Sequence, residues 1–178
     1  MAVTTARGVD LDGMTTWNRG VALAVVFGLV SVPWTYGFVE TLEIPLWPAF
    51  IGSATVFAAG GGTPGLKRGY ASNLVGVVYA AATLAVVDGY FAGSIVALSL
   101  VVGAFMFLAS LHEFVAALSF TPGTFFGYAT MFSVEAAGAA VPGTTGLGGE
   151  TLAAAVSMLV GALIGFGAGE LADRLGDA

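Results

Sequence analysis

Cysteine is absent from the sequence, and histidine occurs only once, at His112. The lack of cysteine excludes disulfide bonds, thiolate metal sites and cysteine nucleophiles, and one histidine cannot form a metal site alone. The stretch GGGTPGLK at residues 60–67 lacks the glycine-lysine-hydroxyl ending of a phosphate-binding loop. We therefore expect the protein to use no metal and no cofactor.

Charged residues are scarce as well. They make up 9% of the 178 residues, whereas 57% are hydrophobic, and the mean hydropathy is +0.93. A soluble domain carries roughly 25% charged residues, which keep its surface in solution. Residues 1–20 are polar and show no small-residue cleavage site before the first apolar run, so we expect no cleaved signal peptide. The composition indicates a membrane protein that keeps its first hydrophobic segment.

Six segments approach the length of about 20 apolar residues that a membrane-spanning helix needs. If the N-terminus is cytoplasmic, every Lys and Arg falls on the cytoplasmic side of these segments, and the opposite loops carry only acids. We therefore predict a multi-pass protein of the cell (inner) membrane with both termini in the cytoplasm. The segments are residues 21–39, 46–59, 70–87, 94–111, 115–134 and 152–169.

The second half of the chain repeats three phrases of the first. FIGSATVF at residues 50–57 returns as FFGYATMF at residues 125–132, an offset of 75. Because each half holds three segments, an odd number, the second copy must cross the membrane in the opposite direction. Such inverted repeats are typical of transport folds, whose substrate sites lie near the middle of the membrane. The other pairs are VALAVVFG (21–28) with VALSLVVG (96–103), and SNLVG (72–76) with SMLVG (157–161).

The expected fold is all-α and polytopic, with six membrane segments built as a 3+3 inverted-topology repeat. The expected parts are a polar cytoplasmic segment (1–20), a first three-helix repeat (21–90), a second, inverted repeat (91–171) and a cytoplasmic tail (172–178).

Proline interrupts the second and fifth segments, which are the central ones of the two repeats. Regular helices are expected to begin at Pro48 and Pro122, because proline suits the first turn of a helix. From Pro48 to Ala59 the second helix has 12 residues, about 18 Å at the standard rise, which is too short to cross the membrane. Short, interrupted helices at matching positions of two repeats indicate a site near the middle of the membrane.

Helical spacing divides each recurring octet into a bulky face and a small, polar face. The small residues can serve close helix packing, with each threonine hydroxyl bonded to the preceding turn. Alternatively, Thr55 and Thr130 meet near the pseudo-two-fold axis and line a pore between apolar constrictions of phenylalanine. The two interpretations can coexist. The pore or substrate-binding candidates are Phe50, Gly52, Thr55, Phe57, Thr124, Phe125, Gly127, Thr130 and Phe132.

Other polar residues have two interpretations each. His112 and Glu113, at the inner junction of the fourth and fifth segments, form either an interfacial polar pair or a gate or proton relay. Glu135 is either a solvated acid or a group that attracts cations at an outer mouth. Asn73 is expected to bond a neighbouring helix, and because its repeat counterpart Met158 is apolar, a strictly two-fold polar filter is disfavoured.

Motifs around the two octets also carry a family resemblance. They are Trp47, Phe50, Gly52, Phe57, the triplet Gly65-Leu66-Lys67 and the run FTPGTFFG at residues 120–127. These segments resemble a family of uncharacterised prokaryotic inner-membrane proteins, the domain-of-unknown-function family 1097, over about residues 20–170. The resemblance implies a small multi-span membrane protein and supplies no activity. The polar N-terminus and the loop at residues 138–150 depart from the family pattern.

The favoured function is a channel or facilitator for a small polar, neutral solute that passes between the inverted repeats. A proton- or sodium-coupled secondary transporter is the first alternative, and a non-transporting membrane scaffold is the second. An enzyme is not expected, because the apolar segments offer no nucleophile beside a base. The expected partners are the lipid bilayer, the solute and further copies of the chain, and no nucleic acid.

Overall fold

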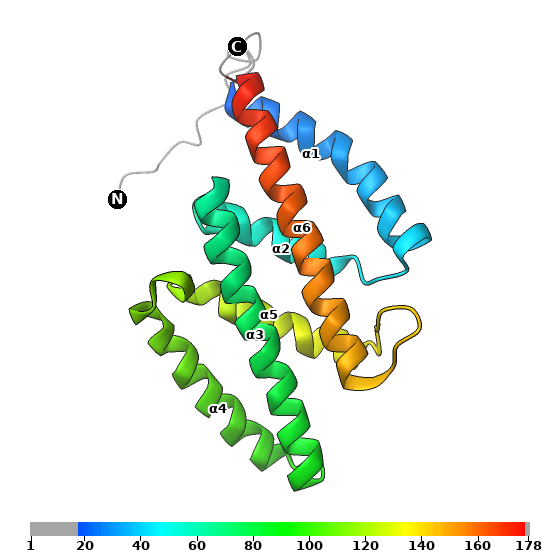
Figure 1. The fold of residues 1–178 in the computed structure, drawn as a ribbon, viewed down its shortest axis with the longest axis vertical. Helices are drawn as coiled ribbons and strands as arrows, with labels where there is room; N and C mark the ends of the chain where they lie inside the picture. Colours follow the sequence, from blue (N-terminus) through cyan, green and yellow to red (C-terminus); the bar gives the residue numbers. More distant parts are fainter. Residues whose placement is uncertain (1–17, 177–178) are drawn as a thin grey trace, which may run out of the picture.

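The computed structural model describes residues 18–176, so the expectations for residues 1–17, including the cytoplasmic position of Arg7, lie outside the described residues. Within residues 18–176 the chain forms helices, turns and links and no strand. Six α-helices make up most of this range (Figure 1). They are α1 Arg19–Tyr36, α2 Trp47–Ala58, α3 Gly62–Phe91, α4 Ile95–Leu111, α5 Thr121–Ala136 and α6 Gly146–Gly176.

Three short helices modify the links. The π-helix η2, Gly37–Leu42, continues α1, and the 3₁₀ turns η3, His112–Phe114, and η4, Ala116–Leu118, lie between α4 and α5. Pro33 inside α1 removes one helical N–H, and the chain then widens into η2 within one turn. Irregular backbone therefore precedes both α2 and α5.

Within residues 18–176, four helical segments are long and apolar enough to cross a membrane. The shorter central helices, α2 with 12 residues and α5 with 16, do not reach that length. The chain thus has the helices of a multi-pass membrane protein, with four candidate spans where the sequence predicted six segments. These spans are Arg19–Leu42, Gly62–Phe91, Ile95–Phe114 and Gly146–Gly176.

Three helix starts differ from the boundaries predicted from hydropathy. α3 begins at Gly62 instead of residue 70, because Pro64 lies in the first turn, where its missing N–H breaks no bond. α6 begins at Gly146 instead of residue 152, and the glycine-rich start packs against the preceding loop. α5 begins only at Thr121, because Val115 has an extended backbone that interrupts the expected segment 115–134.

The links between helices lie along two opposite edges of the molecule (Figure 1). Both ends of the described chain, the α2–α3 turn and the α4–α5 link lie along the upper left edge. The α1–α2 link, the α3–α4 turn and the α5–α6 loop lie along the lower right edge. An ion pair between Arg19 and Asp173 joins the start of α1 to the end of α6. All six helices therefore run between the same two edges.

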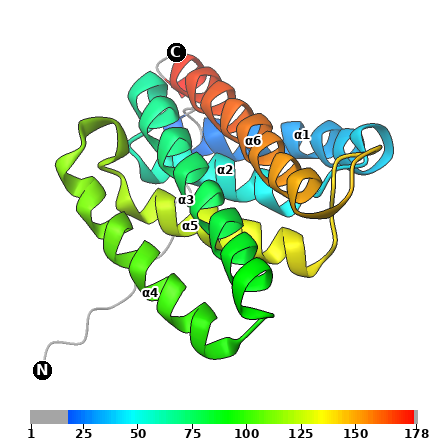
Figure 2. The same ribbon diagram turned by 60° about the horizontal axis from the view of Figure 1, so that its bottom comes forward.

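The helices pack as two groups of three, which we call the α1–α2–α6 group and the α3–α4–α5 group. In each group the short helix crosses a long one, α2 on α6 and α5 on α3, and these are the two most extensive helix contacts (Figure 2). α1 lies beside α6, and α4 lies beside α3. Each group therefore combines helices from both halves of the sequence.

Glycines bring α2 and α6 into backbone contact. Gly161 of α6 faces the backbone of Ala49, and Gly52 of α2 faces the backbone of Met158. A Cβ atom added at either glycine would lie closer than 3.0 Å to several backbone atoms of the other helix. Small residues at such positions let membrane helices approach closely. The distance between α2 and α6 is therefore set by hydrogen atoms on two glycines.

The crossing of α5 on α3 is made in the same way. Gly76 of α3 faces the backbone of Thr124, and Gly127 of α5 faces the backbone of Asn73. Here too a Cβ atom at either glycine would lie closer than 3.0 Å to backbone atoms of the neighbouring helix. Gly76 and Gly161 both lie near the middle of helices of 30 and 31 residues. The two crossings therefore occur midway along the two longest helices.

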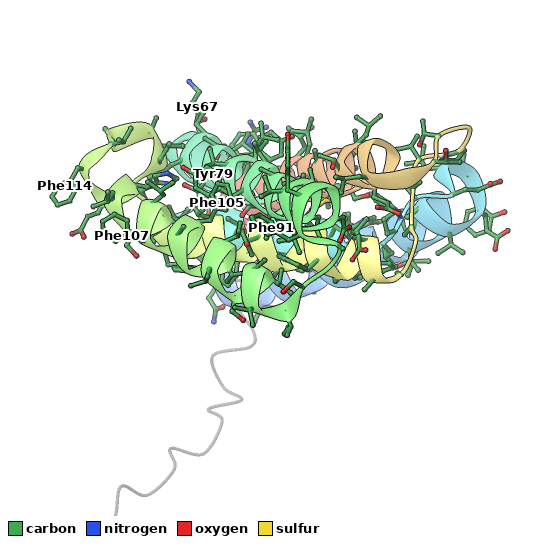
Figure 3. The ribbon with its side chains drawn as sticks, turned by 90° about the horizontal axis from the view of Figure 1, so that it is seen from below. Lys67, Tyr79, Phe91, Phe105, Phe107 and Phe114 are labelled. Atoms are coloured by element: carbon green, nitrogen blue, oxygen red, sulfur yellow. The ribbon has the colours of Figure 1, made fainter. Side chains whose placement is uncertain are left out.

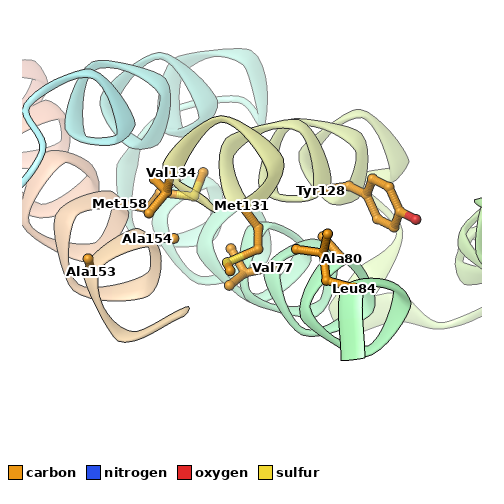
Figure 4. Close-up of a cluster of buried hydrophobic side chains, with 9 residues drawn as sticks. All are labelled: Val77, Ala80, Leu84, Tyr128, Met131, Val134, Ala153, Ala154 and Met158. Carbon is orange, nitrogen blue, oxygen red and sulfur yellow. The ribbon is translucent and has the colours of Figure 1, made fainter. Parts of the chain in front are cut away.

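An apolar core joins the two groups (Figure 4). Its side chains come from α3, α5 and α6, and the largest fully buried ones are Met131 and Met158. Methionine is unbranched and fills irregular gaps between helices. The cluster consists of Val77, Ala80, Leu84, Tyr128, Met131, Val134, Ala153, Ala154 and Met158.

The helix α4 and the turn η3 that follows it lie at the periphery and expose large apolar side chains. Phe107 and Phe114 point away from the other helices, whereas Phe105 faces Tyr79 of α3 (Figure 3). Phe114 is 84% exposed and Leu100 is 71% exposed. An exposed apolar face of this kind suits contact with lipid tails.

Candidate functional site

Eight uncharged serine, threonine and asparagine side chains are buried on the central helices α2, α3, α5 and α6. Two of them, Thr83 and Thr124, contact Tyr128 and His112, and the other six are distributed along the four helices. None of them carries a charge, and each is exposed by 3% or less. Ser53 and Thr55 lie on α2, Ser72 and Asn73 on α3, Thr130 on α5 and Ser157 on α6. We call these six residues the polar set.

Hydroxyl groups elsewhere in the helices bond to their own backbone. Thr83, Ser99 and Ser110 each donate to the carbonyl oxygen four residues earlier, at 2.8–3.0 Å. This is the usual way in which an apolar environment satisfies a serine or threonine in a helix. Thr55 does the same with Ile51, at 2.8 Å.

The other five residues of the polar set make no such hydrogen bond to their own backbone. Among residues 18–176 no hydrogen-bond partner is present for five of its side-chain atoms. A buried polar group without a partner costs about 1–3 kcal/mol, so each of these five atoms is costly to bury. The unpaired atoms are Oγ of Ser53, Ser72 and Ser157, Oγ1 of Thr130 and Nδ2 of Asn73.

The two threonines of the octets are both fully buried but have different surroundings. Oγ1 of Thr55 lies 3.3 Å from Oδ1 of Asn73, so α2 and α3 share a polar contact. Oγ1 of Thr130 has no partner among residues 18–176. In the recurring phrases SNLVG and SMLVG, Met158 stands where Asn73 does. The two threonines therefore differ in their polar neighbours.

The phenylalanines of the octets do not surround a common space. Phe50 packs on Trp34 with ring centroids 4.7 Å apart, and Phe57 packs on Phe27 at 5.5 Å. Phe125 is 40% exposed. Phe132 packs on Tyr128 of its own helix, at 5.1 Å. These rings therefore support the helices from outside the polar set.

The remaining pore candidates lie at the helix crossings. Gly52 and Gly127 are the crossing glycines described above. Thr124 is fully buried, and its Oγ1 lies 3.5 Å from Nδ1 of His112.

His112 is buried in a separate network at the upper left edge. Its Nε2 lies 2.9 Å from the hydroxyl oxygen of Tyr79, and its Nδ1 faces Thr124. The neighbouring Glu113 is exposed, and Glu135 is partly exposed. His112 therefore joins η3 to α3 and α5 and makes no hydrogen bond to Glu113. Within residues 18–176, no three acidic or histidine side chains come together as a metal site requires.

Two depressions open at opposite edges of the molecule. The basic depression, of about 410 Å³, lies between the start of α3 and η4, and Lys67 and Arg68 line it. The acidic depression, of about 510 Å³, lies between the α1–α2 link and the α5–α6 loop, and Glu43 and Trp47 line it. In Figure 1 these segments lie on the upper left and the lower right edge respectively. The polar set lies on the helices between them.

Sequence reasoning missed several residues of this region. In the sequence, three serines look like ordinary small residues in apolar helices: Ser53, Ser72 and Ser157. The last two begin the recurring phrases, SNLVG and SMLVG. The bond from Trp47 Nε1 to Ser133 Oγ, 3.0 Å long, links α2 to α5 and had no sequence signal.

Comparison with known proteins identifies a family and no function. The chain matches the family described as "Protein of unknown function (DUF1097)" over residues 24–173. No curated protein and no solved structure matches it.

Proposed function

The chain belongs to the DUF1097 family, whose function is unknown, and from its geometry we propose that it carries a small neutral solute across a membrane. The observation that carries this proposal is the polar set, with five unpaired buried atoms on helices that run between two depressions at opposite edges. In this proposal the solute replaces the missing hydrogen-bond partners as it passes. The two depressions are the entrances on the two sides of the membrane.

We infer an inverted repeat, and helix contacts support it in addition to the sequence phrases. If a two-fold axis relates the halves, each helix contact must recur with its partners exchanged. Gly52 against Met158 then corresponds to Gly127 against Asn73, at the sequence offsets of 75 and 85. By the same offsets, Ala49 against Gly161 corresponds to Thr124 against Gly76.

The two depressions lie at opposite edges of the molecule (Figure 1), as the two entrances of an inverted repeat would. In inverted-repeat transporters, one group of helices rocks against the other around a central site. We assign that motion to the α1–α2–α6 and α3–α4–α5 groups.

The contacts between the two groups suit such a motion. Within each group, glycine crossings place backbone on backbone, which fixes the helices relative to one another. Between the groups, α2 and α3 also touch through the backbone, where Gly65 faces the carbonyl oxygen of Val56. Elsewhere, side-chain bonds such as Trp47 to Ser133 and Tyr70 to the Ala155 carbonyl can break without unfolding a helix. Because Trp47 lines the acidic depression, breaking its bond to Ser133 would deepen that depression toward the polar set.

The charge distribution favours a neutral solute and a passive mechanism. The polar set has no ionisable group, and no Asp or Glu is buried among residues 18–176. Coupling to protons or sodium needs an ionisable group that faces the route, and an unpaired charge inside the membrane is costly. Glu113 is exposed, Glu135 is partly exposed, and His112 is occupied by Tyr79 and Thr124.

A non-transporting scaffold is the second candidate function. The observation that favours it is the closeness of the glycine crossings, which leave the polar set fully enclosed. In that case the hydroxyls would be small residues that permit helix packing, and no solute would reach them.

Proteoliposomes distinguish these functions. We expect wild-type protein to speed the permeation of acetamide, urea or glycerol above that of empty liposomes in stopped-flow re-swelling. Thr130→Val replaces the unpaired hydroxyl with a methyl group and leaves the volume of the side chain nearly unchanged. We expect it to change the permeation rate of the solute by up to about tenfold, which corresponds to the free energy of one hydrogen bond. Ser110→Ala is the matched control, because this hydroxyl is exposed on α4 and bonded to Met106.

Permeation no faster than in empty liposomes for every neutral solute would contradict transport and favour the scaffold. Equal effects of Thr130→Val and Ser110→Ala would place the route elsewhere in the protein.

A further inference from the structure

The hydrogen bonds of Thr55 determine which end of the Asn73 side-chain amide is free. Oγ1 of Thr55 lies 2.8 Å from the carbonyl oxygen of Ile51 and 3.3 Å from Oδ1 of Asn73. A threonine hydroxyl has a single proton, and the shorter contact, to a carbonyl that can only accept, requires it. Two acceptors at Oδ1 and Oγ1 would then face each other without a proton between them.

Rotating the side-chain amide of Asn73 by about 180° removes this contact between two acceptors. The oxygen and nitrogen of a side-chain amide are assigned from their hydrogen bonds, and here the network requires a donor next to Thr55. With the NH₂ group on that side, Asn73 donates to Thr55, and Thr55 donates to Ile51. The other amide position, which has no partner among residues 18–176, is then held by the oxygen. Asn73 therefore presents a buried, unpaired acceptor.

We propose that Asn73 selects the solute, and that the solute is a small neutral molecule with an N–H donor, of the primary amide class. This inference rests on the proposed transport function. A buried amide oxygen is satisfied by a donor and left unsatisfied by a molecule that only accepts. Sites with buried polar groups discriminate strongly against analogues that lack the matching group.

The equivalent position in the second half of the chain is apolar. Met158, the counterpart of Asn73, is fully buried and belongs to the apolar cluster with Met131 and Ala154. Of the two equivalent positions, only Asn73 therefore offers a hydrogen-bonding group. A primary amide carries an NH₂ group that can donate to the Asn73 oxygen.

Two competitors of the same shape test this inference. Propionamide and butanone differ only in that an NH₂ group in the first is a CH₃ group in the second. We expect propionamide to slow acetamide permeation through wild-type protein in liposomes, and butanone at the same concentration to leave it unchanged. Asn73→Met, which makes the position equal to its repeat counterpart, is expected to lower acetamide permeation about tenfold and to abolish the difference between the competitors.

A second variant keeps the test decisive if Asn73→Met does not fold, which size-exclusion chromatography in detergent would reveal. Thr55→Val keeps the amide but removes the hydroxyl that orients it, so the preference for propionamide should shrink there too. Equal competition by butanone and propionamide in wild-type protein would overturn the inference and leave transport intact. Wild-type discrimination retained in both variants would also overturn it. If no neutral solute permeates wild-type liposomes faster than empty ones, the proposed function and the inference both fail.

Discussion

Gly161→Ala is expected to lower the free energy of unfolding by about 1–3 kcal/mol or more, which is the usual cost of adding a methyl group to a tightly packed contact. The added methyl group would overlap the carbonyl carbon, carbonyl oxygen and Cα of Ala49. All three are backbone atoms, so no side chain can rotate to make room. The helix α2 would have to move away from α6. Thermal unfolding in detergent, followed by tryptophan fluorescence, measures the effect.

Two further substitutions make this prediction specific. Gly76→Ala should destabilise the protein to a similar extent, because Gly76 faces the backbone of Thr124 in the other crossing. Gly103→Ala is the control: nothing lies within 4 Å of a Cβ at that position in α4. Alanine favours a helix over glycine by about 1 kcal/mol, so this variant should be as stable as wild type or more stable. Equal melting temperatures for all three variants would contradict the glycine crossings.

Tying the two helix groups together at Trp47 and Ser133 is expected to stop transport. The two side chains bond across the groups at 3.0 Å, beside the acidic depression. Because the natural chain has no cysteine, Trp47→Cys with Ser133→Cys introduces the only two thiols. Bridging them with a short bifunctional thiol reagent should reduce acetamide permeation in liposomes to the background rate, and a reducing agent should restore it.

The control bridge lies within one helix group. Tyr79 and Phe105 pack with ring centroids 4.7 Å apart, and both belong to the α3–α4–α5 group. Tyr79→Cys with Phe105→Cys, bridged by the same reagent, should leave the permeation rate at its unbridged value. If bridging at Trp47 and Ser133 leaves permeation unchanged as well, the two groups do not move relative to one another during transport.

Much of the helical framework could be predicted from the sequence because proline and hydropathy act locally. The predicted length of 12 residues for the second helix agrees with α2, and Pro48 and Pro122 lie in the first turns of α2 and α5. The early starts of α3 and α6 could not be predicted, because glycine-rich turns were taken to end a helix. Packing against neighbouring segments keeps these turns helical.

The site was only partly predictable for a different reason. Helical periodicity shows which residues share a face, but it does not show what covers that face. Gly52 and Thr55 were correctly grouped on a small face, yet the backbone of Met158 lies against Gly52 and Asn73 contacts Thr55. Phe50 shares a face with Phe57, but Phe50 packs on Trp34 of α1 and stays 45% exposed, so it does not line the polar set. Such contacts depend on helices far apart in the sequence.

The central claim is that the polar set becomes accessible from each side of the membrane in turn. The most direct measurement is the labelling of Thr130→Cys by a membrane-impermeant maleimide, applied separately to each face of oriented vesicles. Ser94→Cys, in the exposed α3–α4 turn, should react from one face only, and Thr83→Cys, buried within one helix group, should not react. Thr130 is fully buried in this structure. If the polar set opens to each side in turn, Thr130→Cys should nevertheless react from both faces, and acetamide should slow the reaction. No reaction at Thr130→Cys from either face, with or without acetamide, would contradict it.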